Sequence, residues 1–263
     1  MEKTSISVVI ITKNEEERIS DCIKSVNEWA DEVVIVDDES IDKTQYIAQK
    51  LGAKVLVKKM EIEGAHRNWA YQQTKNQWVL SLDADERATA DLKKEISEIL
   101  KSNPECVSFS IPRKNHIGNY WIRWGGQYPS PQIKLIRKDK FKWEEVEVHP
   151  RALGEGKNGR LSGDIIHYTY RNWGDFLNKL NNQTTLEAKK WYNYSFENPK
   201  KARYKMNVVH ALWRVFDRFM RTYFRKKGYR DGFIGFMIAY FASLYQIVSY
   251  AKYREFKKNG KKK

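Results

Sequence analysis

The chain has 263 residues, of which 41% are hydrophobic and 13% aromatic, and its formal net charge is +15. This composition excludes a wholly disordered chain and allows one large α/β domain, alone or with an appended segment. Residues 200–263 hold 18 of the 48 lysines and arginines but only 3 of the 33 acids, so residues 1–199 carry 30 of each sign. The basic C-terminal quarter is therefore expected to face a partner.

Two cysteines, Cys22 and Cys106, show no metal-type spacing, so we expect both to be reduced core thiols. The first three residues lead directly into a predicted strand, without the regions typical of a signal peptide. The catalytic part is therefore expected to stay in the cytoplasm.

The first hundred residues alternate between predicted strands and predicted helices. Apolar runs rich in β-branched residues predict strands at 5–11, 32–36, 55–57 and 78–82. Helices are predicted between these strands. The first has an apolar stripe at Ile19, Cys22, Ile23 and Val26. The second begins with a capping box of Asp42 and Gln45 and ends at Gly52, and the third covers 64–74. Thr89 is expected to cap a further helix. This alternation predicts an α/β fold with a doubly wound, mostly parallel sheet.

Polar residues follow three of these strands where each strand ends. They are Thr12, Asn14 and Glu15, then Asp37 and Asp38, then Asp83 and Asp85. In an open α/β sheet such positions meet at one crevice, and paired carboxylates there can hold a divalent cation that also binds phosphates. The alternative for the Asp-Ala-Asp sequence is a polar loop that leads into the next helix. No glycine-rich phosphate loop follows the first strand, which excludes a dinucleotide dehydrogenase and a P-loop ATPase.

Several motifs together resemble a known enzyme family. They are Val8-Val-Ile-Ile-Thr-Lys-Asn-Glu, Val36-Asp-Asp-Glu-Ser-Ile-Asp-Lys-Thr and Leu80-Ser-Leu-Asp-Ala-Asp-Glu. In order and spacing they resemble the inverting GT-A glycosyltransferases of family 2. Further motifs, Ala65-His-Arg-Asn-Trp-Ala, Val146-Glu-Val-His, Ile166-His-Tyr-Thr-Tyr and Arg230-Asp-Gly-Phe-Ile-Gly-Phe, are similar to the bacterial lipopolysaccharide core β-1,4-glucosyltransferases. Two departures are Glu39, where the family usually has glycine, and Pro150, where it usually has glutamate.

The resemblance implies roles for the residues at the strand ends. Asp85, Asp83 and His167 would hold Mn²⁺ or Mg²⁺, with Asp85 the more direct ligand. A lone histidine is more often structural, but the motif match makes a metal or phosphate role for His167 about as well founded. Asp37 or Asp38 would accept the imide N–H of uracil. The rest of the nucleotide-sugar site would comprise Thr12, Asn14, Glu15 and Arg67. Arg67 is equally well explained as a solvated surface arginine.

The second half contains the acceptor-side residues. Strands are predicted at 105–112 and 133–136, and the aromatic, glycine-rich segment 115–131 is expected to be a loop over the site or, alternatively, a cap on the edge of the core. An inverting transfer needs a carboxylate as general base. Glu147 is the first candidate and Glu145 the second, because residues two apart face the same way on a strand.

The C-terminal part has helical sequence patterns over 172–194 and 200–225, and residues 228–231 interrupt them. The stretch 233–250 contains no charged residue and precedes a basic tail. We expect a catalytic domain over 1–170, with a nucleotide-sugar half to 103 and an acceptor half over 104–170, followed by a helical extension over 171–263. In the expected arrangement, 233–250 lies in the inner face of the plasma membrane as a peripheral helix. Anionic head groups would meet Arg214, Arg218, Arg221, Arg225, Lys226 and Lys227. The alternative is a helix packed on the catalytic domain or in a homodimer.

The expected reaction is transfer of glucose from UDP-glucose to a lipid-linked glycan such as a lipopolysaccharide core. One alternative is a nucleotidyltransferase that makes sugar nucleotides on a similar sheet. Another is a nucleic-acid-binding module, suggested by the basic tail with interleaved aromatics. We expect no specific nucleic-acid binding, because such a tail attracts polyanions without reading their sequence.

Overall fold

The computed structural model describes residues 5–102, 104–146 and 151–259. The chain forms two compact units, the first of residues 1–114 and 130–168 and the second of residues 115–129 and 169–263. The expected boundary near residue 170 differs from this division in one place, because residues 115–129 group with the helical unit.

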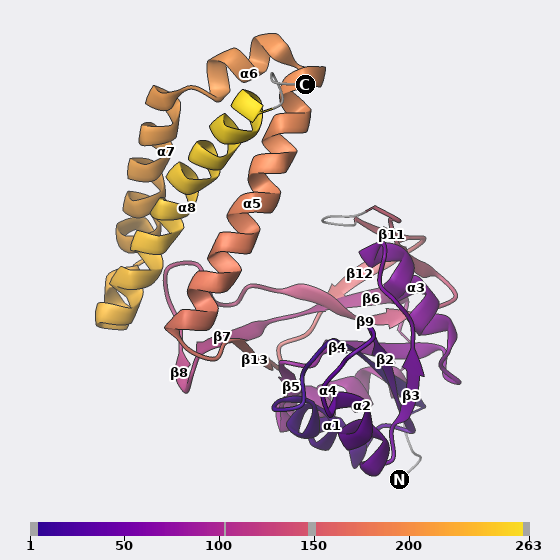
Figure 1. The fold of residues 1–263 in the computed structure, drawn as a ribbon. Helices are drawn as coiled ribbons and strands as arrows, with labels where there is room; N and C mark the ends of the chain where they lie inside the picture. The colour runs from indigo at the N-terminus through magenta and orange to yellow at the C-terminus, as the bar shows by residue number, and fades with distance from the viewer. Residues whose placement is uncertain (1–4, 103, 147–150, 260–263) are drawn as a thin grey trace. The chain divides into compact units, whose positions relative to one another are not determined.

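Seven strands form the main sheet of the first unit in the order β12-β6-β9-β4-β1-β2-β3 (Figure 1). They are β1 (Ile6–Thr12), β2 (Glu32–Asp37), β3 (Lys54–Val57), β4 (Trp78–Asp83), β6 (Cys106–Ile111), β9 (Gln132–Arg137) and β12 (Lys157–Arg160). β1 is parallel to β2 and β4, and β2 is parallel to β3. β9 is antiparallel to β4 and β6. The sheet is thus the mostly parallel α/β sheet expected from the sequence.

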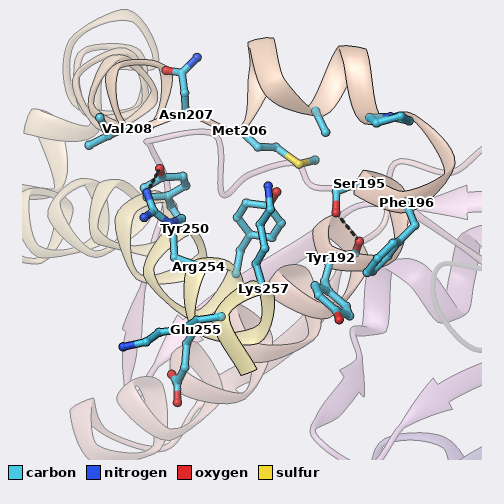
Figure 2. A pocket seen from close by; sticks show the side chains of 14 residues that line it. Tyr192, Ser195, Phe196, Met206, Asn207, Val208, Tyr250, Arg254, Glu255 and Lys257 are labelled. Carbon is cyan, nitrogen blue, oxygen red and sulfur yellow. Dashed lines mark hydrogen bonds between the residues drawn. The ribbon is translucent and has the colours of Figure 1, made fainter. Parts of the chain in front are cut away.

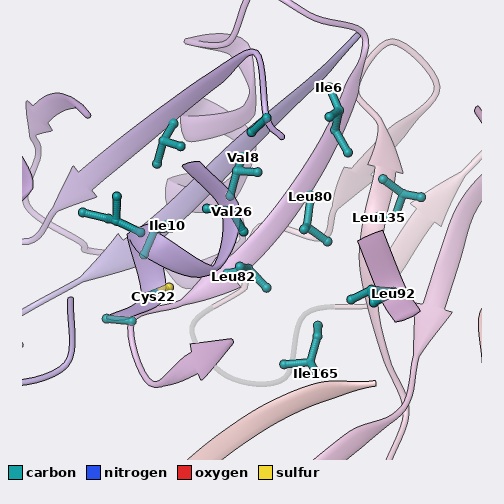
Figure 3. Packing of buried hydrophobic residues seen from close by; sticks show 14 of the residues in the cluster. Ile6, Val8, Ile10, Cys22, Val26, Leu80, Leu82, Leu92, Leu135 and Ile165 are labelled. Carbon is teal, nitrogen blue, oxygen red and sulfur yellow. The ribbon is translucent and has the colours of Figure 1, made fainter. Parts of the chain in front are cut away.

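Helices cover both faces of this sheet. They are α1 (Ile19–Asn27), α2 (Thr44–Lys50), α3 (Glu63–Gln72) and α4 (Ala90–Lys101). Along β1, Ile6, Val8 and Ile10 pack in one core cluster with residues of α1, α2 and α4, several of which Figure 3 shows. Val9, which points to the opposite face, packs in a second cluster with α3 residues. This burial on both faces explains why β1 is apolar throughout rather than alternating.

Local sequence signals were mostly confirmed. The predicted stripe of α1 is fully buried, and the Thr89 side chain accepts from Leu92 N as the cap of α4. The capping box of Asp42 and Gln45 was wrong, because Gln45 Nε2 donates to Asp37 Oδ1 instead, at 2.6 Å. Asp42 still stabilises the start of α2, since its Oδ1 accepts from the backbone N–H of Thr44.

The predicted cysteine environments can be compared with the structure directly. Cys22 is fully buried in the core, and burial raises the pKa of its thiol. Cys106 is partly buried and packs against the same core cluster. Both thiols are free, as expected.

Six further strands lie outside the main sheet. They are β5 (Glu86–Ala88), β7 (Arg113–Ile117), β8 (Tyr120–Trp121), β10 (Phe141–Trp143), β11 (Ala152–Gly154) and β13 (Ile165–Tyr170). The expectation of a loop over 115–131 was wrong in part, because β7 pairs with β8 in an antiparallel hairpin. The aromatic side chains contact residues of their own unit, with Trp121 edge-on to Tyr128 and Arg230 over Trp124. These contacts fit the core-edge alternative.

The second unit is mainly helical. It comprises α5 (Trp173–Glu197), α6 (Pro199–Lys205), α7 (Val208–Met220), a π-helical turn η1 (Arg221–Arg225), a 3₁₀ turn η2 (Gly228–Asp231) and α8 (Gly232–Asn259). α8 packs against both α5 and α7. The helical stretch 228–259 is long and apolar enough to cross a membrane by length and composition, and 39% of its most apolar window is buried inside the structure.

Candidate functional site

The three polar clusters lie at one edge of the main sheet. The strand register places Thr12 of β1 opposite Asp37 of β2, and Ile11 opposite Asp83 of β4. β2 and β3 lie on one side of β1 and β4 on the other, so the direction of winding reverses between β1 and β4. Ligands of doubly wound sheets bind at the strand ends beside such a reversal.

Asp83 lies between two cations at this edge. Its Oδ1 is 3.2 Å from a guanidinium nitrogen of Arg67, and its Oδ2 is 2.8 Å from Nζ of Lys134. Burial acts to raise the pKa of Asp83, but Lys134 and Arg67 outweigh it and hold that pKa well below its ordinary value. Arg67 is therefore directed inward at the site and is not a solvated surface arginine.

Glu86, three residues after Asp83, joins the same charge cluster. Its carboxylate is fully buried and accepts from Asp83 N and from Lys134 Nζ, the latter at 2.5 Å. A guanidinium nitrogen of Arg113 lies 3.5 Å from its other oxygen. The sequence reasoning missed all three of Glu86, Lys134 and Arg113. Lys134 carried a signal, because a lysine inside the apolar run of β9 needs a buried acid as partner.

Asp85 faces a different set of groups. Its Oδ2 lies 3.6 Å from Nε2 of His167 and 3.8 Å from a guanidinium nitrogen of Arg18. Its backbone carbonyl accepts from Tyr168 N, which fixes β13 beside the Asp-Ala-Asp turn. Burial acts to raise the pKa of Asp85, but His167 and Arg18 outweigh it, so that this pKa lies below its ordinary value. Arg18 was not among the predicted site residues.

Asp85 and His167 bring a carboxylate oxygen and an imidazole nitrogen within 3.6 Å of each other, the kind of pair that can hold a divalent cation. Asp83 is held more tightly by protein cations, because each of its oxygens lies within 3.2 Å of one, whereas the cation beside Asp85 is 3.8 Å away. Within the described ranges, no group of three or more His, Cys, Asp or Glu is placed to hold a metal. Two protein ligands still suffice for a cation whose other ligands are diphosphate oxygens and water. The role of Asp83 as a direct ligand stays a prediction.

Asp37 and Asp38 differ in what their carboxylates contact. Asp37 is fully buried, and its oxygens accept from Ser40 N, Ser40 Oγ and Gln45 Nε2. These bonds hold the turn in which Glu39 takes a φ of 53°, the conformation that glycine would adopt without strain. Asp37 therefore stabilises the loop and has little capacity left for a ligand.

Asp38 has one protein partner on each oxygen. Met60 N donates to Oδ1 at 2.8 Å, and Lys13 Nζ donates to Oδ2 at 2.9 Å. Burial acts to raise the pKa of Asp38, but these two donors outweigh it and lower the pKa below its ordinary value. A carboxylate oxygen can accept two bonds, and Asp38 accepts two bonds in all where Asp37 accepts three, so Asp38 keeps more acceptor capacity than Asp37.

Two buried polar groups near Asp38 are poorly satisfied by the described residues. Oγ1 of Thr12, whose carbonyl accepts from Asp38 N, has no hydrogen-bond partner there. The ring of His66 on α3 has at most the backbone of Lys59. Burial lowers the pKa of His66, against the charge of Asp38, which raises it. Buried polar groups without partners are rare in folded proteins and require an explanation. The sequence reasoning included Thr12 but missed His66.

Asn14 and Glu15 connect loops in the structure. Asn14, at a φ of 53°, accepts from Ile41 N and donates its backbone N–H to Ser40 Oγ. The Glu15 carboxylate forms a bidentate pair with the guanidinium of Arg18. Through Arg18, Glu15 is linked to Asp85, so both predicted residues lie at the site but contact protein groups.

The segment with the candidate base packs against α3. The Asn68 side chain on α3 donates from Nδ2 to the carbonyl oxygen of Trp143 and accepts at Oδ1 from Trp143 N. Its Nδ2 also lies 3.4 Å from Glu145 Oε1. A Cβ on Gly64 would lie 1.9 Å from the carbonyl oxygen of Glu144, so only glycine allows this approach. Residues 144–146 are not in a strand, which overturns the argument from strand alternation. Glu147 lies outside the described residues.

The second unit contains a hollow of about 1180 Å³ at the end of the helical bundle. Figure 2 shows side chains of α5, α6 and α8 around it, including Tyr192, Tyr250 and Arg254. Its described lining residues include one acid, Glu255, and none of the predicted site residues. The edge of the sheet in the first unit is therefore the better candidate for catalysis.

Comparisons with known proteins agree with this choice. The model of the family described as Glycosyl transferase family 2 matches residues 7–154. An uncharacterized glycosyltransferase of Rickettsia typhi is 30% identical over 95% of this chain and 87% of that protein. The lipopolysaccharide core biosynthesis glycosyltransferase LpsC of Rhizobium meliloti is 27% identical over 95% of this chain and 92% of that protein.

Among solved structures, glucosyl-3-phosphoglycerate synthase from Mycobacterium tuberculosis, in complex with Mn²⁺, uridine diphosphate and glucosyl-3-phosphoglycerate, is similar in part. It is 21% identical and covers 43% of this chain and 44% of its own, at a TM-score of 0.37. A likeness of this extent carries no argument about the ligands of this chain.

Proposed function

This chain belongs to glycosyl transferase family 2 and is a glycosyltransferase, and we propose that it transfers a hexose, with inversion, from a UDP-sugar to a lipid-linked glycan. Glucose is the proposed sugar and a lipopolysaccharide core the proposed acceptor. Relatives named as glycosyltransferases span nearly the whole chain, one of them named for lipopolysaccharide core biosynthesis. Family membership favours this reaction over the nucleotidyltransferase and the nucleic-acid-binding module.

The uracil pocket is proposed around Asp38. Its remaining acceptor capacity suits the imide N–H of uracil, and the unsatisfied Thr12 Oγ1 and the buried His66 ring offer further polar atoms nearby. A nucleobase with donors and acceptors on one edge would satisfy groups that the described protein leaves without partners. Asp37 supports this pocket by fixing the loop behind it.

The diphosphate and its divalent cation, Mn²⁺ or Mg²⁺, are proposed at Asp85 and His167. A cation bound there would offset the negative charge that builds on the departing diphosphate. Arg67 and Lys134 hold the Asp83 carboxylate from two sides, so its orientation is set before a substrate arrives. Arg18 fixes Asp85 relative to Glu15 and the backbone of β13 in the same way.

The acceptor hydroxyl needs a base to take its proton as the bond to the anomeric carbon forms. Glu147 is the proposed base, and Glu145 is the second candidate. Asn68 supports either choice, because it binds the backbone just before these residues and lies next to Arg67 on α3. Segment 143–145 contacts α3, the helix that carries Arg67, which supports placing the acceptor-side acids near the donor site.

The observation that carries the proposal is the Asp85 carboxylate at the end of β4, with His167 Nε2 3.6 Å away and a cation-bound Asp83 two residues earlier. The test is thermal unfolding of the full chain with UDP-, GDP- and dTDP-sugars, with and without Mn²⁺. We expect UDP-sugar and Mn²⁺ together to raise Tm by more than the sum of their separate effects. Asp85→Asn should remove this synergy, and stabilisation by GDP-sugars alone would contradict the uracil pocket.

A further inference from the structure

Helix α7 and the following π-helical turn expose an apolar face. Between Val209 and Phe224, six residues have more than a third of their whole-residue surface exposed, and all six are apolar. They are Val209, Leu212, Trp213, Phe216, Met220 and Phe224, with exposed fractions from 37% to 73%. Their spacing of three and four residues places them on one side of the helix. We call these six residues the α7 face.

The two arginines of α7 are turned toward the rest of the helical unit, whereas the Asp217 side chain is 44% exposed. The Arg214 guanidinium lies 4.3 Å from the ring centre of Trp191 on α5, and burial lowers the pKa of Arg214. Arg218 is also half-buried and lines a cavity with Phe176 and Phe241. This inverts the usual order of a surface helix, in which charged residues face water. It also corrects the expectation that Arg214 and Arg218 are free to meet head groups.

The stretch 233–250 was expected to lie in the membrane interface, and part of it is buried inside the helical unit instead. Ile238, Ala239 and Phe241 are buried, and further along α8 Tyr250 and Tyr253 are buried too. These side chains form the core that α8 shares with α5 and α7. They cannot enter a bilayer without dismantling the helical unit.

The first turns of α8 extend the α7 face. Phe236 on α8 is 6.0 Å, ring centre to ring centre, from Phe219 on α7, and it stacks on Tyr240. Phe233, Phe236 and Tyr240 are all more than a third exposed. A continuous exposed apolar surface spanning two helices is unusual for a monomer free in water and marks an interaction site.

Exposed cations stand at the end of this surface. Arg225, Lys226, Lys227 and Arg230 are exposed around η1 and η2, and residues 200–263 together carry a net charge of +15. We propose that the α7 face docks on an anionic lipid bilayer, with Trp213 and Phe216 in the boundary between head groups and acyl chains and the cations at η1 and η2 on the head groups. Aromatic side chains prefer this boundary, and clustered lysines and arginines are attracted to anionic lipid.

Charge decides between a bilayer and a second copy of the chain. A symmetric dimer through the α7 face would bring together two C-terminal segments that each carry a net charge of +15, and they would repel each other. An anionic bilayer would instead attract and neutralise the positive charge of a single segment. A true span by α8 would have to expose to lipid the side chains that form its contacts with α5 and α7. The proposal does not rest on the donor or acceptor, because neither is needed for docking.

The test is flotation of the full chain with vesicles of phosphatidylcholine and phosphatidylglycerol, and with phosphatidylcholine alone. We expect binding to the anionic vesicles that weakens as salt is raised. The double variant Trp213→Ser with Phe216→Ser should bind at least about tenfold more weakly. The matched control is Tyr46→Ser on α2, an exposed aromatic of the other unit that should leave binding unchanged. Circular dichroism checks that each variant stays folded.

Two further measurements separate the outcomes. Brominated acyl chains should quench tryptophan fluorescence in the wild type, and Trp213→Phe should remove most of that quenching. Arg225→Glu with Lys227→Glu should weaken binding to anionic vesicles without changing the fold. The proposal is overturned if the double variant binds as the wild type does, if anionic vesicles do not bind, if alkaline carbonate fails to release the protein, or if the α7 face proves to mediate dimerisation.

Discussion

Nζ of Lys134 lies 2.8 Å from Oδ2 of Asp83, in a strand that runs antiparallel to the strand carrying Asp83. The same ammonium group contacts the fully buried carboxylate of Glu86. One buried cation thus contacts two acids that come from a short stretch beside the predicted metal site, and Arg67 and Arg113 supply further positive charge to them. We infer that Lys134 fixes Asp83 in position, and that the site depends on β9 as much as on the parallel strands.

Replacement of Lys134 tests this dependence. Lys134→Met keeps most of the side-chain volume but leaves Glu86 buried without its closest cation. Removal of one partner of a buried pair usually costs about 3–5 kcal/mol, so we expect a loss of that order in the free energy of unfolding by urea.

The matched control is Lys157→Met. Lys157 lies 2.8 Å from Glu105, but both side chains are more than 70% exposed. Exposed pairs contribute about 0–1 kcal/mol, so this variant should unfold almost as the wild type does. If both variants lose the same free energy of unfolding, the buried Lys134 pair contributes no more to stability than the exposed pair does.

Acid should weaken the fold through Asp83. Burial acts to raise its pKa, but Lys134 and Arg67 lower it below the value of about 3.9 found in unfolded chains. Its contribution to stability is therefore present above that pH and is lost as the pH falls toward the lower folded pKa. Asp83→Asn should reduce the slope of unfolding free energy against pH below about pH 4. Asp139→Asn, in an exposed pair with Arg137, should leave the slope unchanged.

The sequence was most informative where one element could be read by itself. The apolar run of β1 and the stripe of α1 each depend on neighbours within a few residues, and both were confirmed. The capping box of Asp42 and Gln45 failed because Asp37, from another element, binds Gln45. Local pattern cannot show which of two nearby acids a side chain will reach in the folded chain.

Pairings between distant segments were beyond the sequence. Lys134 is 51 residues from Asp83, and His167 is still further from Asp85. Both pairings follow from strand order, which places β9 beside β4 and β13 beside β5. The inward turn of Arg214 was also unpredictable, because a basic, apolar helix can present either side to its neighbours.

Asp85→Asn should leave the chain folded but nearly inactive. Loss of the carboxylate charge should remove several kcal/mol of transition-state stabilisation. This corresponds to a fall in kcat/KM by a factor of about 10²–10⁴, measured with a UDP-sugar and Mn²⁺. Asp21→Asn is the control, because Asp21 is an exposed aspartate on α1. Near wild-type turnover by a folded Asp85→Asn protein would refute the metal role of Asp85.

The general base can be assigned by two matched substitutions. Glu147→Gln should abolish sugar transfer and leave UDP-sugar affinity nearly unchanged, because the base acts only in the transition state. Glu145→Gln, which keeps an acceptor within reach of Asn68, should have a small effect on kcat. The measurements are single-turnover transfer and calorimetric binding of UDP-sugar. If only Glu145→Gln stops transfer, the base lies two residues earlier.

Thr12→Val separates a binding role from a structural one. Thr12 Oγ1 is buried without a partner in the described chain, so its removal should not lower the free energy of unfolding and should raise it by up to about 1 kcal/mol. If the hydroxyl binds the donor, the affinity for UDP should fall by about two- to tenfold.

The control is Thr44→Val, since Thr44 Oγ1 accepts from Glu15 N and donates to Asp42 Oδ1. That change should cost about 1–3 kcal/mol of stability, because it leaves buried groups unpaired. A Thr12→Val protein that is less stable but binds UDP normally would make Thr12 a structural residue.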